Sequence, residues 1–538
     1  MSTIRKTMKS TLYIGLAAAA LTLTSCNGWL NEETPGTTTV EDYFTSGKTA
    51  ELVVNAAYVP LAWEFNNTYF SEWYIGDIAS DDALKGGQDV NDGADAYDID
   101  NFKVNINNGI LLDYYRAKFQ GIGRCNLALS EVPQVDLDET LTAERRDCLM
   151  GEAYFMRAFY YFQLARVFGG VPLIDDVIDT SDRWQQPRAT LEATYDHIIA
   201  DLLEAEKVIW NKSRYEAKDL GRATRGAVLA MLCKVYLTRG DYANAYTWGK
   251  KFVDEQYGAE YSLCPVYTDN FTLAGENGPE SVFEIQYMAD PTSDYGEGFG
   301  FTRGTFSTIL TRPRMSNLGG NKGWGFDHPT IDLYNEFEAG DSRREAAIGV
   351  PDAVSQQEVE VMYLNTPYYN NKVSYSEGGT FPALDHATRS PFNYRLIRAA
   401  DVLLLYAEAA LETGHTSDAK WALEQVRARA RANADASVAN ALPEFPGYRG
   451  YKDTTDDLRS AIRHERRVEL AMEGHRWFDL VRWGIAAQVM DRDNGSYGKN
   501  ESPEVREQMA AFIAGKHELF PIPAEEIGLN PMEQNPGY

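Results

Sequence analysis

The chain has 538 residues, of which 44% are hydrophobic and 12% aromatic, a globular composition long enough for one large domain or for two to three ordinary ones. Its formal net charge is −28. A surface this acidic repels phosphate backbones, so the charge argues against nucleic-acid binding.

The first 25 residues have the pattern of a bacterial signal peptide. A positive segment with Arg5, Lys6 and Lys9 precedes an apolar stretch over 11–23, which is too short to span a bilayer. Its removal takes away three positive charges and no acid, so the mature chain has a net charge of −31. No later stretch approaches 18 uninterrupted apolar residues, so we expect no spanning helix in the rest of the chain.

Leu23-Thr24-Ser25-Cys26 follows the apolar stretch and resembles the lipobox of bacterial lipoproteins. The cysteine thiol would take a diacylglycerol and become the mature N-terminus, with acyl chains such as palmitate as the membrane anchor. We therefore expect lipidation at Cys26 and a polar tether over 26–44. The alternative is an ordinary signal peptide followed by an incidental cysteine.

The other four cysteines favour buried free thiols over disulfides. Three of them lie in helix-like apolar patterns, and no CxxC or Cys/His spacing indicates a metal site. Oxidation in an exported protein is the alternative. The four are Cys125, Cys148, Cys233 and Cys264.

Helical patterns recur in pairs along the chain. In 222–256, small alanines allow two helices to approach closely around a turn at Gly240, which resembles one tetratricopeptide (TPR) unit. Four such pairs are predicted, enough for a solenoid to bury its faces. They span about 45–130 (interrupted), 143–209, 222–256 and 394–431.

Three long insertions interrupt these pairs, at about 61–108, 261–393 and 432–455. They are rich in Gly, Asn, Asp and aromatic residues. Loops of this length are usually functional or disordered, and their aromatic content argues against disorder.

Six segments form a series along the chain. They are CNGWLNEETPG (26–36), GEAYFMRAFYYFQLARVFGGVPLI (151–174), FDHPTIDLYNEFEAGDSRR (326–344), YRLIRAADVLLLYAEA (394–409), RRVELAMEGHRWFDLVRWG (466–484) and LFPIPAEEIGLNPMEQNPGY (519–538). In this order they resemble the SusD/RagB family, the surface glycan-binding lipoproteins of Bacteroidetes. The resemblance covers nearly the whole mature chain.

The resemblance implies a single SusD-like domain over 45–538. Its fold would be mostly α, a right-handed superhelix of four TPR-like pairs that carries an irregular, long-loop ligand-binding subdomain. Family members are non-catalytic lids over a TonB-dependent, SusC-like outer-membrane transporter, and they capture oligosaccharides at the cell surface. A minority branch, RagB-like, captures peptides.

The stretch MEGHRWFDLVRWG (472–484) has the residue types of a catalytic site. On a helix, however, Glu473–Arg476, Arg476–Asp479 and Asp479–Arg482 are each three apart, which predicts a ladder of ion pairs. Glu473 and Asp479 would be about 9 Å apart along such a helix, so a glycosidase pair is not excluded by spacing. Arg476 between them would lower both pKa values, whereas a general acid needs a raised one.

Other enzyme signatures are missing. HERRVEL (464–470) is not HExxH because position 468 is Val, and no GxSxG, GxGxxG or phosphate-binding P-loop occurs. No cofactor is expected. A structural calcium ion on Asp77, Asp81 and Asp82 is the single metal hypothesis, with a solvated loop as the alternative.

Sugar binding requires aromatic faces that stack on rings and polar groups that contact hydroxyls. Three loop clusters, at 63–82, 287–303 and 314–328, offer both. The predicted glycan-binding residues are Trp73, Tyr74, Asp81, Asp82, Tyr295, Phe299, Phe301 and Trp324. Glycines on either side of Trp324 favour display of its indole, and we expect Trp73 to be exposed as well. Trp63 and Tyr69 are expected to pack in the core.

The sequence thus predicts an outer-membrane, cell-surface lipoprotein that binds oligosaccharide and delivers it to a transporter. The alternatives are a peptide-capturing lid of the same family, a secreted glycosidase and a TPR scaffold that binds only protein.

Overall fold

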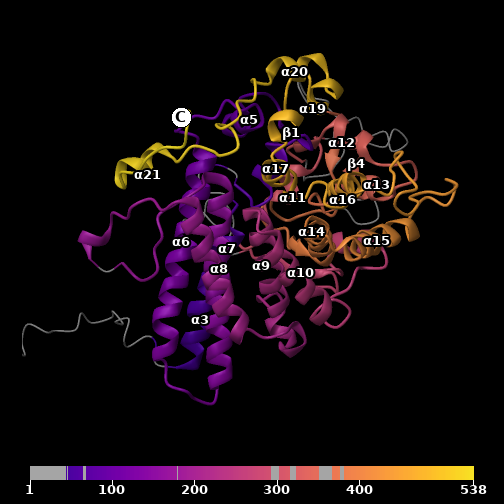
Figure 1. The fold of residues 1–538 in the computed structure, drawn as a ribbon. Coiled ribbons are helices and arrows are strands. Elements are labelled where there is room, and N and C mark those ends of the chain that lie inside the picture. Colours follow the sequence, from indigo (N-terminus) through magenta and orange to yellow (C-terminus); the bar gives the residue numbers. More distant parts are fainter. Residues whose placement is uncertain are drawn as a thin grey trace, which may run out of the picture.

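Four packed helix pairs form the frame of the molecule. The computed structural model describes residues 44, 46–64, 68, 70–178, 180–291, 302–314, 323–350, 366–375 and 381–538. Within these ranges the pairs are α3 (Gly47–Tyr58) with α6 (Gly109–Glu131), α7 (Ala143–Phe168) with α8 (Leu191–Val208), α9 (Arg225–Arg239) with α10 (Tyr242–Glu255), and α14 (Ala399–Glu412) with α15 (Thr416–Ala432). α6 packs on α7, α8 on α9 and α10 on α14, so the pairs follow one another in chain order (Figure 1). The mostly α fold with four helix pairs is confirmed, whereas the signal peptide and Cys26 lie outside the described residues.

Local sequence signals set where these helices begin and end. The side chains of Thr142, Thr190 and Thr224 each accept a hydrogen bond from the backbone N–H three residues further on, which caps α7, α8 and α9. α7 ends at Gly169 (φ 79°), and the α9–α10 turn contains Gly240 (φ 85°). Both positions have backbone conformations that other residues adopt only with strain.

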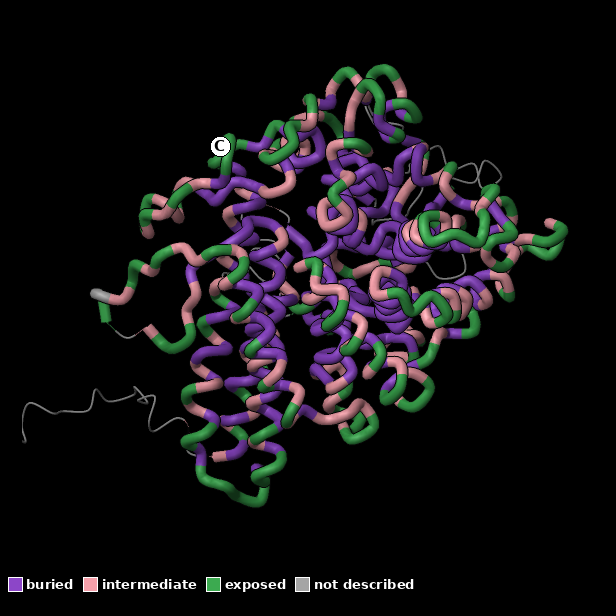
Figure 2. The backbone as a smooth tube through the Cα atoms, in the orientation of Figure 1, coloured by how far each residue is buried: buried purple, intermediate pink, exposed green. Residues whose placement is uncertain are grey.

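The core runs along the inside of the helix pairs and into the C-terminal half (Figure 2). α7 is buried over most of its surface because α3, α6, α8 and α9 all pack against it. Cys125, Cys148, Cys233 and Cys264 are buried free thiols, which confirms that prediction. Burial raises the pKa of all four, so their reactive thiolate form is suppressed.

The described parts of the insertions contain short regular elements around three two-stranded antiparallel sheets, β1–β3, β2–β6 and β4–β5. The first insertion forms α4 (Tyr74–Ile78), β1 (Ala83–Gly86) and α5 (Ala94–Asp100). The second forms β2 (Ser281–Ile285), α11 (Ser307–Thr311), β3 (Phe326–Pro329), α12 (Ile331–Glu336), α13 (Arg343–Ala347), β4 (Ile348–Gly349) and β5 (Tyr369–Asn370), and β6 (Tyr394–Arg398) leads into α14.

The chain ends in a series of shorter helices, most of them beside the insertion elements and the last beside α6 (Figure 1). These are α16 (Thr455–Glu469), α17 (Arg476–Arg482), α18 (Ala486–Val489), α19 (Ser496–Asn500), α20 (Pro503–Gln508) and α21 (Ala524–Leu529). Single 3-10 turns occur at η1 (Val59–Ala62), η2 (Val132–Gln134), η3 (Ser181–Arg183), η4 (Lys212–Arg214), η5 (Ala217–Asp219) and η6 (Tyr267–Phe271). In the described ranges, no helix is both long and apolar enough to cross a membrane.

Candidate ligand-binding site

The first two insertions meet at a buried carboxylate. Glu64 accepts hydrogen bonds from Thr305 Oγ1 (2.8 Å), the backbone N–H of Phe306 (2.6 Å) and Ser307 Oγ (2.5 Å). Burial raises the pKa of Glu64, and the hydrogen bonds from these groups oppose that rise. This carboxylate therefore fixes the loop after η1 against the start of α11.

A small sheet joins the same two insertions a second time. β1 pairs with β3, with Leu84 opposite His328, and the backbone N–H of Thr330 donates to Asp82 O (2.9 Å). Segments more than 200 positions apart in sequence are thereby adjacent.

Trp73 and Tyr74 are core residues, and the expected exposure of Trp73 is wrong. Each is 1% exposed, and Trp73 Nε1 donates to Ser307 Oγ (3.3 Å). The reason is the packing of α4: a Cβ on Gly76 would lie 2.1 Å from the carbonyl oxygen of Gly474, so no space exists between α4 and the chain before α17. With α4 held this close, neither ring is accessible to a ligand.

Asp81 and Asp82 are also internal, with exposures of 0% and 1%. Asp81 receives two hydrogen bonds from Arg476 (2.7 and 2.8 Å), and Asp82 is paired with Arg467 (2.8 Å). Burial raises the pKa of Asp81, but Arg467 and Arg476 outweigh it and leave that pKa below its ordinary value. For Asp82 burial dominates and the pKa rises to about 6. These carboxylates hold α16 and α17 against the first insertion, and neither can contact a glycan or complete the predicted calcium trio.

The stretch around α17 is structural. α17 begins only at Arg476, and of the three predicted ladder pairs the structure forms Asp479–Arg482 (2.9 Å). Glu473 instead pairs with Arg398 and Lys372, and Arg476 with Asp81.

Neither acid of this stretch suits general acid catalysis. Burial raises the pKa of Glu473, but Arg398 and Lys372 more than offset it, and the pKa stays below its ordinary value. Arg466 and Arg482 do the same for Asp479. Both carboxylates are therefore ionised and committed to ion pairs, as the sequence indicated, although the cations that lower the pKa values come from other elements.

Four predicted residues remain, and the structure describes one of them. Tyr295, Phe299 and Phe301 lie outside the described residues. Trp324 is half-buried, with its ring edge-on to Phe306 at 4.9 Å and its backbone N–H donating to Ile309 O (2.9 Å). Of the predicted aromatic residues that the structure describes, Trp324 is the one with an accessible surface.

An open cavity of about 610 Å³ lies beside these loops. Its walls come from α3 and η1, from α6, from the turn 218–222, from the end of β2 and from 302–303. This volume is within the range typical of small-molecule sites. The lining mixes apolar with polar side chains, among them Val59, Leu61, Leu220 and Met288 on one hand and Asn55, Arg124, Gln286 and Thr302 on the other.

Arg124 forms part of the α6 wall of this cavity, whereas Trp63 does not line the cavity and packs against the core, as expected from the sequence. Trp63 follows η1 and is half-buried, and the guanidinium of Arg124 lies 5.2 Å from its ring centroid. Arg124 Nη1 also donates to Ala56 O (3.1 Å), which orients the group. Sequence reasoning missed Arg124 because it lies inside the regular pattern of α6, far from any loop signal.

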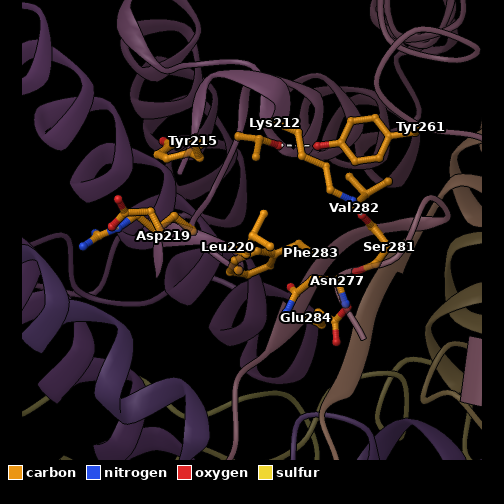
Figure 3. A pocket seen from close by; sticks show the side chains of 13 residues that line it. Lys212, Tyr215, Asp219, Leu220, Tyr261, Asn277, Ser281, Val282, Phe283 and Glu284 are labelled. Atoms are coloured by element: carbon orange, nitrogen blue, oxygen red, sulfur yellow. Dashed lines mark hydrogen bonds and ion pairs between the residues drawn. The ribbon is translucent and has the colours of Figure 1, made fainter. Parts of the chain in front are cut away.

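A narrower cavity of about 20 Å³ adjoins the large one behind Leu220 and Glu284 (Figure 3). Lys212 Nζ donates to Gly278 O (2.6 Å) there, and Thr224 is hydrogen-bonded to the hydroxyl of Tyr261 (2.7 Å). The volume suffices for a water molecule or two and excludes a sugar ring. The larger cavity is therefore the one that can hold a ligand.

No metal-binding group was found in the described ranges: no three or more His, Cys, Asp or Glu side chains are grouped there so as to hold an ion. The arrangement offers aromatic surface, apolar wall and hydrogen-bonding groups, which is the chemistry of a binding site.

Two family models match this chain. One, described as the SusD family, matches residues 346–538, and the other, described as starch-binding associating with outer membrane, matches residues 29–237. SusD-like protein P2 of Formosa agariphila is 27% identical over 546 residues, covering 96% of this chain and 98% of its own length. A SusD-like protein of Bacteroides ovatus is 30% identical over 353 residues, covering 62% of this chain and 58% of its own.

Solved structures agree over almost the whole chain. A laminarin-binding SusD-like protein has a TM-score of 0.76 at 28% identity, covering 92% of this chain and all (100%) of its own. Surface glycan-binding protein A from Bacteroides uniformis has a TM-score of 0.73 at 26% identity, covering 91% and 99%. With both halves matched by SusD-type family models and the fold shared along its length, this chain belongs to the SusD/RagB family.

Proposed function

We propose that this protein is a non-catalytic lipoprotein of the outer-membrane surface that binds oligosaccharide and delivers it to a TonB-dependent transporter. The observation that carries the proposal is the open cavity of about 610 Å³ between the insertions and the helix pairs, with Tyr58 and Arg124 in its wall. The similarity to a laminarin-binding SusD-like protein supports a glycan as the ligand.

Binding would combine stacking with hydrogen bonding. Tyr58 in the cavity wall would offer ring surface to the C–H side of a sugar ring. The guanidinium of Arg124 has five N–H donors, of which Nη1 already serves Ala56 O, and the others suit neighbouring hydroxyl groups. Trp324 is the second candidate platform, on the loop that follows α11.

Affinity electrophoresis in native gels that contain laminarin, xylan or another soluble polysaccharide tests this function. At least one glycan should retard the protein, and Arg124→Ala should abolish most of the retardation. The control is Trp184→Ala, because Trp184 is 71% exposed on a loop that does not line the cavity. Equal retardation of both variants would show that the cavity is not the site, and capture of peptides without any glycan would favour a RagB-like role.

The lipid anchor and the transporter partner need separate tests. Cys26→Ala should move the protein from the membrane fraction to the soluble fraction and remove labelling by a palmitate analogue. Affinity purification of the tagged, lipidated protein from its own membranes should recover a TonB-dependent barrel. Recovery of the lipoprotein alone under mild detergent would contradict the proposed partnership.

A further inference from the structure

The wall of the open cavity has the opposite charge balance to the molecule as a whole. The chain has 51 Lys and Arg residues against 79 Asp and Glu residues. Among the described residues that line the cavity of about 610 Å³, the basic ones outnumber the acidic ones: Arg124, Lys218, Arg222 and Arg303 against Asp219 and Glu284. A cleft lined mainly by one sign of charge concentrates ligands of the other sign.

Both acids of this wall are already neutralised or withdrawn. Asp219 Oδ1 accepts a hydrogen bond from Arg222 Nε (2.9 Å). The side chain of Glu284 is 1% exposed, and its Oε2 lies 3.8 Å from Nε of Arg395, which does not line the cavity. Arg222 also pairs with Glu152 (2.9 Å), so its own charge is compensated. The charges that remain for a ligand are therefore those of the other three basic residues.

Lys218 and Arg303 keep much of their side chains in solvent, with exposures of 75% and 60%. Lys218 pairs with Glu216 (3.1 Å) and Arg303 with Asp290 (2.8 Å), and neither of these acids lines the cavity. Ion pairs that involve exposed side chains contribute little to stability, because water competes for the charged groups. An anionic ligand in the cavity can therefore attract both cations without disrupting the fold.

Arg124 has no carboxylate partner among the described residues. Its Nη1 donates to Ala56 O (3.1 Å), and the guanidinium lies 5.2 Å from the ring centroid of Trp63. These two contacts hold the group at the α6 wall and leave its other N–H donors for a ligand. Two N–H groups on one edge of a guanidinium match the two oxygens of a carboxylate, and hydrogen bonds between ions are roughly twice as strong as neutral ones.

We propose that the glycan bound in this cavity is anionic, with a carboxylate or sulfate group on its sugar rings that pairs with Arg124 while Lys218 and Arg303 attract it. The inference rests on the proposed function and deepens it, because it names the class of glycan. A uronic acid and a sulfate ester share the relevant chemistry, a negatively charged group of oxygens. Local attraction matters here, since the net charge of −28 repels polyanions from the rest of the surface.

Matched pairs of glycans test the charge directly. Isothermal titration compares oligogalacturonate with its methyl ester, laminarin with laminarin oxidised to the uronate at C6, and carrageenan oligosaccharide with its desulfated form. The members of each pair share chain and linkage and differ in charge. At least one anionic member should bind about tenfold more tightly than its neutral counterpart. Equal or tighter binding of the neutral member in each pair that binds overturns the inference and leaves the proposed function intact, whereas failure of all glycans to bind contradicts the proposed function itself.

The dependence on salt requires no substitution, so it applies even where a variant fails to fold. Raising sodium chloride from about 0.01 M to about 1 M shortens the range of electrostatic attraction from about 30 Å to about 3 Å. The affinity for the anionic glycan should fall by about tenfold or more over this range, and that for a neutral glycan should hardly change. An affinity for the anionic glycan that is independent of salt overturns the inference.

Substitution locates the attraction in the wall. Arg124→Gln should weaken binding of the anionic glycan by about tenfold or more, and Lys218→Gln by about twofold. The matched control is Lys207→Gln, since Lys207 is an exposed lysine paired with Glu204 (2.6 Å) in α8 that does not line the cavity, and it should leave the affinity unchanged. Undiminished affinity in Arg124→Gln, with equal effects of Lys218→Gln and Lys207→Gln, overturns the assignment of the anion to this wall.

Discussion

Buried acids are neutralised differently in the two halves of this molecule. In the network around α15, α16 and β6, each buried acid faces a guanidinium: Glu469 contacts Arg398, Arg429 and Arg343 at 2.6–3.0 Å. In the insertions, carboxyls such as Glu64 and Asp100 are held by hydroxyl or backbone N–H groups. The acids of the paired network are stabilised as ions, whereas burial raises the pKa of Glu64 and Asp100, so these two groups of acids should respond in opposite ways to substitution and to pH.

Removing the central cation of the paired network should have the largest effect. Arg398 is 1% exposed and contacts Glu280, Glu469 and Glu473. Arg398→Met removes one positive charge from beside three buried carboxylates, and we expect a loss of about 3–5 kcal/mol in the free energy of unfolding. Urea denaturation measures it. The control, Lys250→Gln, breaks an exposed pair with Asp254 and should cost less than about 1 kcal/mol. Equal losses in the two variants would refute the contrast.

The pH dependence separates the two regions without any substitution. Burial raises the pKa of Asp100 to about 7 and that of Glu501 to about 7. An acid whose pKa is higher in the folded state stabilises the fold fully below its unfolded pKa of about 4, and that stability is lost as the pH rises through about 7. Each unit by which the folded-state pKa exceeds the unfolded one corresponds to about 1.4 kcal/mol in the free energy of unfolding.

The free energy of unfolding should therefore be lower at pH 8 than at pH 5.5, and Asp100→Asn should reduce the difference. The acids of the paired network should show the opposite pH dependence. Burial raises the pKa of Glu469, but its arginines lower it to about 2, so its contribution is present above the unfolded pKa and is lost only as the pH falls from about 4 toward 2. A free energy of unfolding that rises between pH 5.5 and pH 8 would contradict the raised pKa values of Asp100 and Glu501.

An added methyl group tests how closely α4 approaches the chain before α17. Gly76→Ala would place a Cβ 2.1 Å from Gly474 O, so α4 must move away from the chain before α17. We expect a loss of about 1–3 kcal/mol in thermal or urea unfolding. The matched control is Gly123→Ala in α6, where nothing lies within 4 Å of the added Cβ. That change should stabilise the protein by about 0.5–1 kcal/mol, because alanine favours a helix interior. Destabilisation by both substitutions to the same extent would argue against the close contact.

The sequence predicted the frame well because its signals are local. Capping threonines, the glycines at Gly169 and Gly240, and the apolar spacing within each helix all follow from residues a few positions apart. The candidate site was predicted less well because it depends on partners distant in sequence. Asp81 and Trp73 have the composition of a displayed loop, and only the approach of α16, α17 and Ser307 shows that they are internal. Arg124 gave no signal, since its role depends on the cavity that it lines.

The smallest expected effect distinguishes two tryptophans that the sequence treated alike. Trp73 is buried and donates to Ser307, so Trp73→Phe should lower Tm because the buried hydroxyl loses its indole donor. Glycan affinity per folded molecule should hardly change. Trp324 is half-buried against Phe306, and Trp324→Ala should lower stability by only about 0.5–1.5 kcal/mol while weakening glycan binding measurably. Isothermal titration below the Tm of each variant makes the comparison, because it counts only folded protein. If Trp73→Phe reduces affinity more than Trp324→Ala does, the ligand reaches the surface of α4, and Trp324 is not the platform.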